Sequence, residues 1–273
     1  MTYYEICARL TAAGIEEAAF EASVLLEHFC GVSAASLPLR REEDFSTAAL
    51  IEAVARREQH EPLQYLIGVW GFCGQEYEVN RHTLIPRADT EVLVEEALRR
   101  IPRGGQFIDL CTGSGCIAVS TLCMRRDTRA YAVDLFGETL EVARRNAARN
   151  GVADRLQFLQ ADVLQPLPLD ERFDAILSNP PYIRTDVVKT LAPELAFEPS
   201  AALDGGEDGL IFYRAILSLH RKLLKPGGVI LFEIGYDQGE DLRRLATAHG
   251  LDCRIVRDLG DCDRVAVLTD GEN

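Results

Sequence analysis

The sequence is poor in the features that mark membrane proteins and metal-binding proteins. It has no apolar run long enough to span a bilayer, and its N-terminus lacks the basic and then apolar pattern of a secretory signal. We therefore expect a cytoplasmic protein without membrane contact. Its eight cysteines include no C-x-x-C pair and its five histidines form no ligand pair, so no metal is expected.

Positive charge is also scarce. Lys and Arg total 29 against 43 Asp and Glu, which leaves a formal net charge of −14. Nucleic-acid-binding proteins usually carry a basic surface, so this balance disfavours nucleic acid as a partner without excluding it. The 273 residues, 47% of them hydrophobic, are enough for one large domain and a small one, and nothing in them demands a dimer, so a monomer is expected.

The first part of the chain is predicted to form a small helical domain over residues 1–62. Its apolar residues recur at the spacing of amphipathic helices, and Gly14 and Gly31 interrupt the pattern. Residues 63–86 are predicted to form a β-hairpin linker, because aromatic residues alternate around a tight-turn signal at Cys73.

Residues 87–273 alternate between strand and helix patterns, which predicts an α/β domain with a mainly parallel sheet covered on both faces. The last two strands are separated by a short turn around Gly260 that cannot hold a crossover helix, so this pair must be antiparallel. The expected strands are 107–110, 130–133, 156–159, 175–178, 229–233, 254–257 and 265–268.

A nucleotide-type cofactor site is predicted where the first three strands of this sheet end. The first strand leads into a loop whose glycines allow close backbone approach to a ligand. The second ends at Asp134, which can accept hydrogen bonds from a ribose diol, and the third ends at Asp162 and Val163, which can read an adenine. Either acid could instead cap a helix or face solvent. The residues of the first loop are Cys111, Thr112, Gly113, Ser114 and Gly115.

The fourth strand leads into the most specific motif, Asn179-Pro180-Pro181-Tyr182. The two prolines stiffen the loop and remove two N–H donors. The Asn179 side-chain oxygen and the Pro180 carbonyl can then accept both hydrogens of a planar NH₂ group, while Tyr182 offers a face for stacking. The alternative is a rigid turn without chemistry.

Such a loop suits methylation of a poorly nucleophilic nitrogen. An amide lone pair is delocalised, and holding both N–H bonds lets the nitrogen pyramidalise toward a sulfonium methyl group. The acceptors also stabilise the positive charge that develops on the nitrogen. An exocyclic base amine would fit equally well, so an adenine-N6 nucleic-acid methyltransferase stays an alternative.

Residues 106–182 resemble the class I, seven-stranded, Rossmann-like methyltransferases that use S-adenosylmethionine. Nearly the whole chain resembles the release-factor glutamine methyltransferases, the HemK or PrmC family. The matching motifs are Ile85–Glu91, Asp109–Gly115, Asn179–Tyr182 and Glu198–Gly206. The resemblance implies methyl transfer from S-adenosylmethionine to the glutamine N5 of the Gly-Gly-Gln loop in class-1 peptide chain release factors, the proteins of translation termination.

The resemblance also implies roles for individual residues. The loop from Cys111 to Gly115, with Asp134 and Val163, would contact the cofactor, and Asn179 would face both cofactor and substrate. Pro180, Pro181 and Tyr182 would complete the substrate site. The family usually has glycine at the position of Cys111, often an aromatic residue at that of Val163, and proline at that of Ala88.

Several assignments stay open from sequence alone. Arg87 could guide the substrate or close over the cofactor, or it could simply pair with Asp89 or Glu91 at the start of a helix. Residues 198–209 could wall the substrate pocket or form an ordinary surface connection. A ribosomal-protein glutamine methyltransferase and a non-catalytic adaptor that keeps the cofactor pocket are further alternatives.

Overall fold

The computed structural model describes residues 1–271, and the chain divides into two compact units. One unit comprises Met1–Val69 together with Ala192–Phe197. The other comprises Trp70–Leu191 and the chain from Glu198 onward. The first unit therefore takes six residues from the second half of the sequence, which no local pattern indicated.

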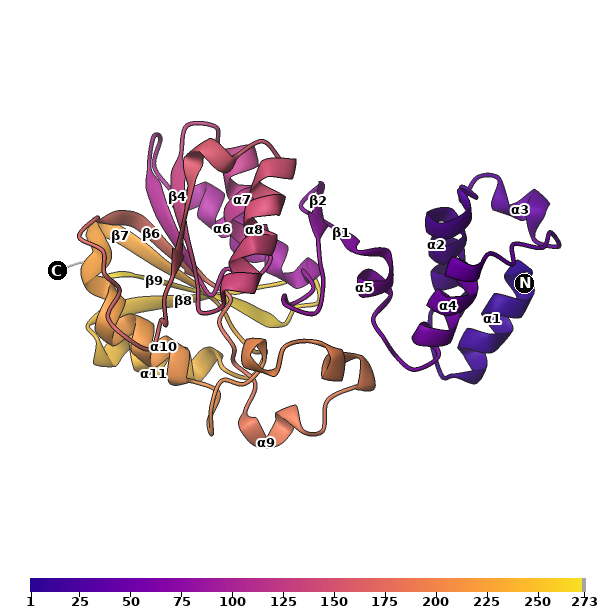
Figure 1. Ribbon diagram of the computed structural model, residues 1–273. Coiled ribbons are helices and arrows are strands. Elements are labelled where there is room, and N and C mark those ends of the chain that lie inside the picture. The colour runs from indigo at the N-terminus through magenta and orange to yellow at the C-terminus, as the bar shows by residue number, and fades with distance from the viewer. Residues whose placement is uncertain (272–273) are drawn as a thin grey trace. The chain divides into compact units, whose positions relative to one another are not determined.

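The first unit is built from short helices around an apolar core (Figure 1). The first helix begins with a capping box, in which Thr2 and Glu5 satisfy each other's backbone N–H groups, and the second ends at Gly31 in the left-handed conformation. The helices are α1 (Tyr3–Ala12), α2 (Ala18–Cys30), α3 (Leu37–Arg40), α4 (Ala48–Arg57) and α5 (Leu63–Ile67).

A buried arginine connects residues 192–197 to these helices. The Arg57 side chain is only 6% exposed, and it pairs with Glu21 at 2.6 Å and with Glu194 at 3.3 Å. His60 Nδ1 lies 3.2 Å from the same Glu194 carboxylate. Because a buried guanidinium is stable only when its charge is matched, this cluster explains why residues 192–197 stay with the first unit.

The predicted hairpin forms from β1 (Val69–Phe72) and β2 (Gln75–Glu78), but its predicted start at residue 63 is wrong, because Leu63–Ile67 form helix α5, which buries Leu63 and Leu66. Cys73 and Gly74 both have positive φ, as a tight two-residue hairpin turn requires. The side chain of Asn146 connects the hairpin to the rest of the second unit: it accepts from Glu78 N at 2.6 Å and donates to Ser114 O at 2.9 Å.

The second unit contains the predicted seven-stranded sheet, in the order β5-β4-β3-β6-β7-β9-β8. Strands β3 to β7 of this sheet are parallel, whereas β9 is antiparallel to both β7 and β8, as the short turn between the last strands predicted. The strands are β3 (Gln106–Leu110), β4 (Arg129–Asp134), β5 (Leu156–Gln160), β6 (Phe173–Ser178), β7 (Leu224–Glu233), β8 (Leu251–Arg257) and β9 (Asp263–Asp270).

Helices cover both faces of this sheet (Figure 1). Alternate strand residues divide between two apolar clusters, so that Phe107 packs with α6 (Glu91–Arg100), α7 (Cys116–Met124) and α8 (Gly137–Arg149), while its neighbour Ile108 packs on the opposite side. That second cluster includes residues of α10 (Ile211–Ala215), the π-helical turn Ile216–His220 and α11 (Gly239–Ala248). The remaining short helix, α9 (Thr185–Val188), lies outside both clusters. The expected α/β fold is confirmed.

The strand order reverses between β3 and β6, and ligands of open α/β sheets bind at such a point beyond the carboxyl ends of the strands. Here Leu110 is paired with Ser178, and the Ser178 hydroxyl donates to Leu110 O at 2.6 Å. The residues that follow, Cys111 and Asn179, are therefore held side by side.

Among residues 1–271, no group of three or more His, Cys, Asp or Glu side chains is arranged to hold a metal ion. None of the helices in this range is both long and apolar enough to cross a membrane.

Candidate active site

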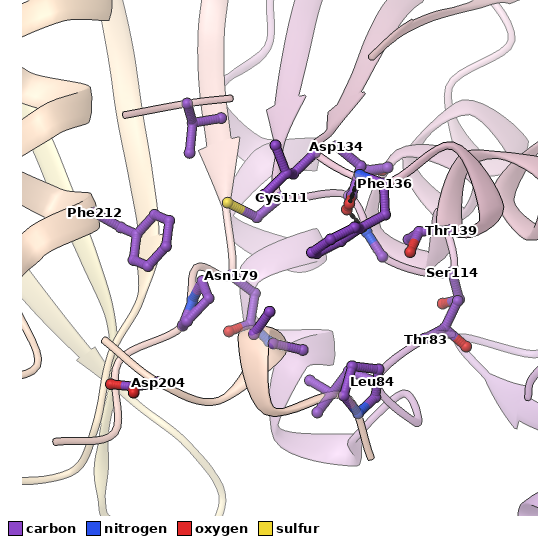
Figure 2. A pocket seen from close by; sticks show the side chains of 18 of the residues that line it. Thr83, Leu84, Cys111, Ser114, Asp134, Phe136, Thr139, Asn179, Asp204 and Phe212 are labelled. Carbon is purple, nitrogen blue, oxygen red and sulfur yellow. Dashed lines mark hydrogen bonds between the residues drawn. The ribbon is translucent and has the colours of Figure 1, made fainter. Parts of the chain in front are cut away.

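A cavity of about 420 Å³ lies at the carboxyl ends of β3, β4, β5 and β6, within the size range of sites for small molecules. Figure 2 shows side chains from separate loops pointing into it, among them Cys111, Phe136 and Asn179. Of the predicted site residues, Arg87, Cys111, Thr112, Gly113, Ser114, Asp134, Asp162, Val163, Asn179 and Pro181 line the cavity.

The loop after β3 wraps one side of the cavity. Cys111 has a φ of 61°, where a residue with a Cβ is disfavoured by about 1–2 kcal/mol and glycine would carry no such cost. The Thr112 hydroxyl donates to the buried Asp109 carboxylate at 2.6 Å, and this hydrogen bond stabilises the loop against the end of β3. Burial raises the pKa of the Cys111 thiol well above its ordinary value, so the sulfur is neutral and is not a nucleophile.

The residues around this loop fit a nucleoside-type cofactor. Asp134 accepts from Gly113 N at 3.0 Å and from Phe136 N at 3.2 Å, which leaves further lone pairs for ligand hydroxyls. The Ser114 hydroxyl lines the cavity and is buried without a hydrogen-bond partner among the described residues. A Cβ at Gly113 would meet no atom within 4 Å, so its backbone faces open space that a ligand can approach.

Other predicted cofactor residues have structural partners. Asp162 caps its own turn by accepting from Leu164 N at 2.8 Å, while still lining the cavity. Val163 is buried, and its carbonyl contacts His220 Nε2 at 2.8 Å. Gly115 is not among the lining residues, and a Cβ there would approach Ala143 Cβ to 3.2 Å, so this glycine allows α8 to pack against the loop.

The Asn179–Tyr182 loop forms another side of the cavity. Asn179 and Pro181 line it, and Pro180 is buried behind them. Tyr182 is not among the lining residues, because its ring packs toward the apolar cluster on the α10 side of the sheet. Burial raises the pKa of the Tyr182 phenol to about 12, so the hydroxyl stays protonated.

Residues 198–209 support this loop from outside and wall the cavity. Ile183 donates to Leu203 O at 3.0 Å and accepts from Gly205 N at 2.8 Å, which pairs the two segments. A Cβ on Gly205 would lie 2.7 Å from Tyr182 Cα, so only glycine permits the contact. Part of this segment lines the cavity, through Pro199, Ala201, Ala202, Asp204 and Gly206.

The suggested pairing of Arg87 with Asp89 or Glu91 is wrong. Arg87 instead forms an ion pair with buried Glu198, 111 positions away, whose other oxygen accepts from Ile85 N at 3.0 Å. Asp89 pairs with Arg264 at 3.2 Å. The Arg87–Glu198 ion pair thus joins the segment before α6 to the segment after residue 197. Both segments line the cavity, and only the fold brings the two side chains together.

Sequence reasoning missed several lining residues. Phe136 is 43% exposed, an unusual position for a large aromatic side chain, and it follows the strand-end acid Asp134 by two residues. Phe212 comes from α10, and no local signal marked it. Thr90 lies at the end of the matching motif Ile85–Glu91 but was assigned no role.

Known proteins resemble this chain over both units. The family model described as PrmC N-terminal domain matches residues 4–68, and the one described as methyltransferase small domain matches residues 87–227. The release factor glutamine methyltransferase of Geobacter sulfurreducens is 41% identical over 264 residues, covering 94% of this chain and 91% of the relative. The enzyme of that name from Cereibacter sphaeroides is 42% identical over 262 residues, covering 94% and 93%.

A solved structure supports the fold alone. The crystal structure of a methyltransferase from Pyrococcus furiosus aligns with a TM-score of 0.55 at 18% sequence identity, covering 73% of this chain and 90% of that one.

Proposed function

The chain belongs to the release factor glutamine methyltransferase family, and from this premise we propose that it transfers a methyl group from S-adenosylmethionine to the N5 atom of a glutamine in a class-1 peptide chain release factor. The resemblance drawn from the motifs is thereby confirmed. One observation carries the assignment of the site: Asn179, whose side-chain oxygen can accept from a planar NH₂ group, lines the same cavity as Cys111, Gly113 and Ser114.

The cavity residues suit the binding of S-adenosylmethionine, which supplies an electrophilic methyl group on a sulfonium sulfur. Asp134 would hold the ribose hydroxyls, Ser114 and the Gly113 backbone would face the polar part of the ligand, and Phe136 offers an apolar face beside them. Among the described residues no metal-binding group is present, and the proposed reaction draws on none.

Asn179, which lines the cavity, would orient the target nitrogen together with the backbone carbonyl of Pro180, a buried residue that is not itself among the lining residues. Their oxygens accept the two N–H bonds of the glutamine amide, which points the lone pair toward the methyl group and stabilises positive charge on the nitrogen as the N–C bond forms and the S–C bond breaks. The amide then loses one proton to water. The reaction needs no strong base before attack, and the neutral Tyr182 phenol fits that scheme.

The direct test is mass spectrometry of a purified release factor incubated with the enzyme and S-adenosylmethionine. The expected product is a Gly-Gly-Gln peptide heavier by one methyl group, with the methyl on the glutamine. A release factor with that glutamine replaced is the control. Methyl incorporation into a ribosomal protein or duplex DNA, with none into the release factor, would contradict the proposal.

We further propose that the enzyme works as a cytoplasmic monomer and that the helical unit contributes to recognition of the release factor. The formal charge of −14 fits a protein partner better than a nucleic acid.

Asp134→Asn is expected to lower the affinity for S-adenosylmethionine by about tenfold. The carboxylate is buried, which raises its pKa, and backbone N–H groups of Gly113 and Phe136 oppose that rise by stabilising the charged form. An amide keeps one acceptor oxygen but loses the charge-assisted hydrogen bonds to ribose. Isothermal calorimetry with S-adenosylmethionine measures the change. Unaltered affinity, at an unaltered melting temperature, would remove Asp134 from the cofactor site.

A further inference from the structure

A buried carboxyl group lies next to the loop that we assign to catalysis. Glu233 is the last residue of β7, and the sheet register pairs Phe232, just before it, with Ser178, just before Asn179. Glu233 is 2% exposed, and its Oε2 atom has no hydrogen-bond partner within residues 1–271. A buried carboxyl group without an ion-pair partner is destabilising, and such groups are common at functional sites. The position of Glu233 at the carboxyl end of β7 therefore indicates a functional role.

The charged groups around Glu233 do not neutralise it by direct contact. Arg264 lowers the pKa of the Glu233 carboxyl through its charge, but the guanidinium forms its ion pairs with Asp89 at 3.2 Å and Asp258 at 3.0 Å. Asp89 acts in the opposite direction. The remaining titratable neighbours, the Tyr182 and Tyr213 phenols and the Cys116 thiol, have raised pKa values and are neutral.

Two polar side chains reach the Glu233 carboxyl. Burial raises its pKa to about 7, and the neighbouring polar side chains of Thr90 and Asn179 oppose the rise. Thr90 is 1% exposed, and its Oγ1 accepts from Asn179 Nδ2 at 3.4 Å. Three segments that are distant in the sequence thus meet around one buried carboxyl group, with Thr90 and Asn179 joined by a hydrogen bond beside it.

The ionised Glu233 carboxylate would determine how the Thr90 hydroxyl and the Asn179 amide are oriented. A carboxylate only accepts hydrogen bonds, so the single Thr90 hydroxyl proton points toward Glu233 and the Thr90 oxygen is left to accept from Asn179. The NH₂ end of Asn179 then faces the protein interior, and its oxygen faces the cavity. A protonated Glu233 can donate, which removes this preference and allows the amide to present its NH₂ end to the substrate.

We propose that Glu233, acting with Thr90, is a positioning residue that fixes the Asn179 amide with its oxygen toward the target nitrogen. The inference rests on the proposed function, because the oxygen is needed only if the substrate presents an NH₂ group. The ionised form is the active one, so turnover falls as the pH drops through about 7.

The same carboxyl group has the opposite effect on stability. Its pKa in the folded protein lies above its ordinary value of 4.5, so folding favours the protonated form and the protein loses stability as the pH rises through about 7. Glu233→Gln removes the buried charge, and the variant is expected to melt no lower than the parent at pH 8. That measurement separates loss of positioning from loss of folding.

One experiment follows the amide itself without substrate. In ¹⁵N–¹H spectra, the Asn179 side-chain resonances, assigned by their loss in Asn179→Ala, should shift between pH 6 and pH 8 with a midpoint near 7. Glu233→Gln should abolish the shift. Resonances that stay fixed over this range in the parent protein would overturn the proposal, even if methyl transfer to a release factor succeeds.

The second experiment measures kcat with a purified release factor. Glu233→Gln and Thr90→Val are expected to lower kcat by about tenfold or more with S-adenosylmethionine affinity nearly unchanged, and Thr90→Ser, which keeps the hydroxyl, should restore most of it. Glu95→Gln is the matched control, since Glu95 is an exposed glutamate on α6. A Glu233→Gln enzyme with the kcat and pH profile of the parent would refute the role. Failure of the parent enzyme on release factors would instead refute the proposed function, and the spectra would still decide the orientation of Asn179.

Discussion

Asn179→Ala is expected to lower kcat for release-factor methylation by about 10²–10³-fold, close to the loss of detectable transfer. The substitution removes an acceptor that would hold the target N–H bond and stabilise positive charge as the methyl group moves. That interaction strengthens in the transition state, so its loss should appear in kcat rather than in binding. Transfer of labelled methyl groups under single-turnover conditions measures the effect.

Cofactor affinity is the internal control for Asn179→Ala. Asn179 lines the cavity from the end of β6, whereas the predicted ribose ligand Asp134 comes from the end of β4. We therefore expect the variant to bind S-adenosylmethionine within about tenfold of the parent affinity. If turnover stays near normal, Asn179 has no catalytic role. If cofactor binding is lost as well, the residue belongs mainly to the cofactor site.

Gly205→Ala is expected to lower kcat by about 10²-fold, although Gly205 is not a lining residue of the cavity. A Cβ at this position would lie 2.7 Å from Tyr182 Cα and 2.8 Å from Pro181 O, and backbone atoms cannot give way as a flexible side chain can. The Asn179–Tyr182 loop must then shift, and a displacement of about 1 Å is enough for a loss of this size. The overpacking should also destabilise the fold by about 1–3 kcal/mol.

Gly71→Ala provides the matched control for Gly205→Ala. Both glycines have φ values outside the left-handed region, but a Cβ at Gly71 would meet no atom within 4 Å. Steady-state kinetics and thermal melting of the two variants should therefore separate the contact with the loop from a general effect of replacing glycine. Equal activity of both variants would show that the segment does not hold the catalytic loop in place.

Much of the second unit could be predicted from the sequence because its signals are local. Each strand is an apolar run bounded by turn residues, and the short turn before β9 leaves no room for a crossover helix. The lining residues of the motifs at Cys111 and Asn179 follow directly after strands, and parallel strands carry their ends to one edge of the sheet. Motif and fold class therefore follow from neighbouring residues.

Even a strong motif left side-chain placement undecided. Tyr182 reads as a stacking surface in the sequence, whereas in the fold its ring packs toward the apolar cluster beside α10. Gly115 reads as a ligand contact, whereas it permits the close approach of Ala143. In both cases the backbone position was predictable, but the direction of the side chain depends on which helix packs behind it.

The sequence by itself determined the fold class, the strand positions and the place of the Asn179–Tyr182 loop at the end of a strand, because these depend on residue periodicity and on turn residues within each segment. Only the tertiary structure decided the partner of Arg87, the inclusion of residues 192–197 in the helical unit, and the hydrogen bond between Thr90 and Asn179. These contacts join residues up to 137 positions apart, as from Arg57 to Glu194. Their formation depends on strand order and helix packing, which satisfy buried polar groups across the whole chain and leave no pattern within any single segment.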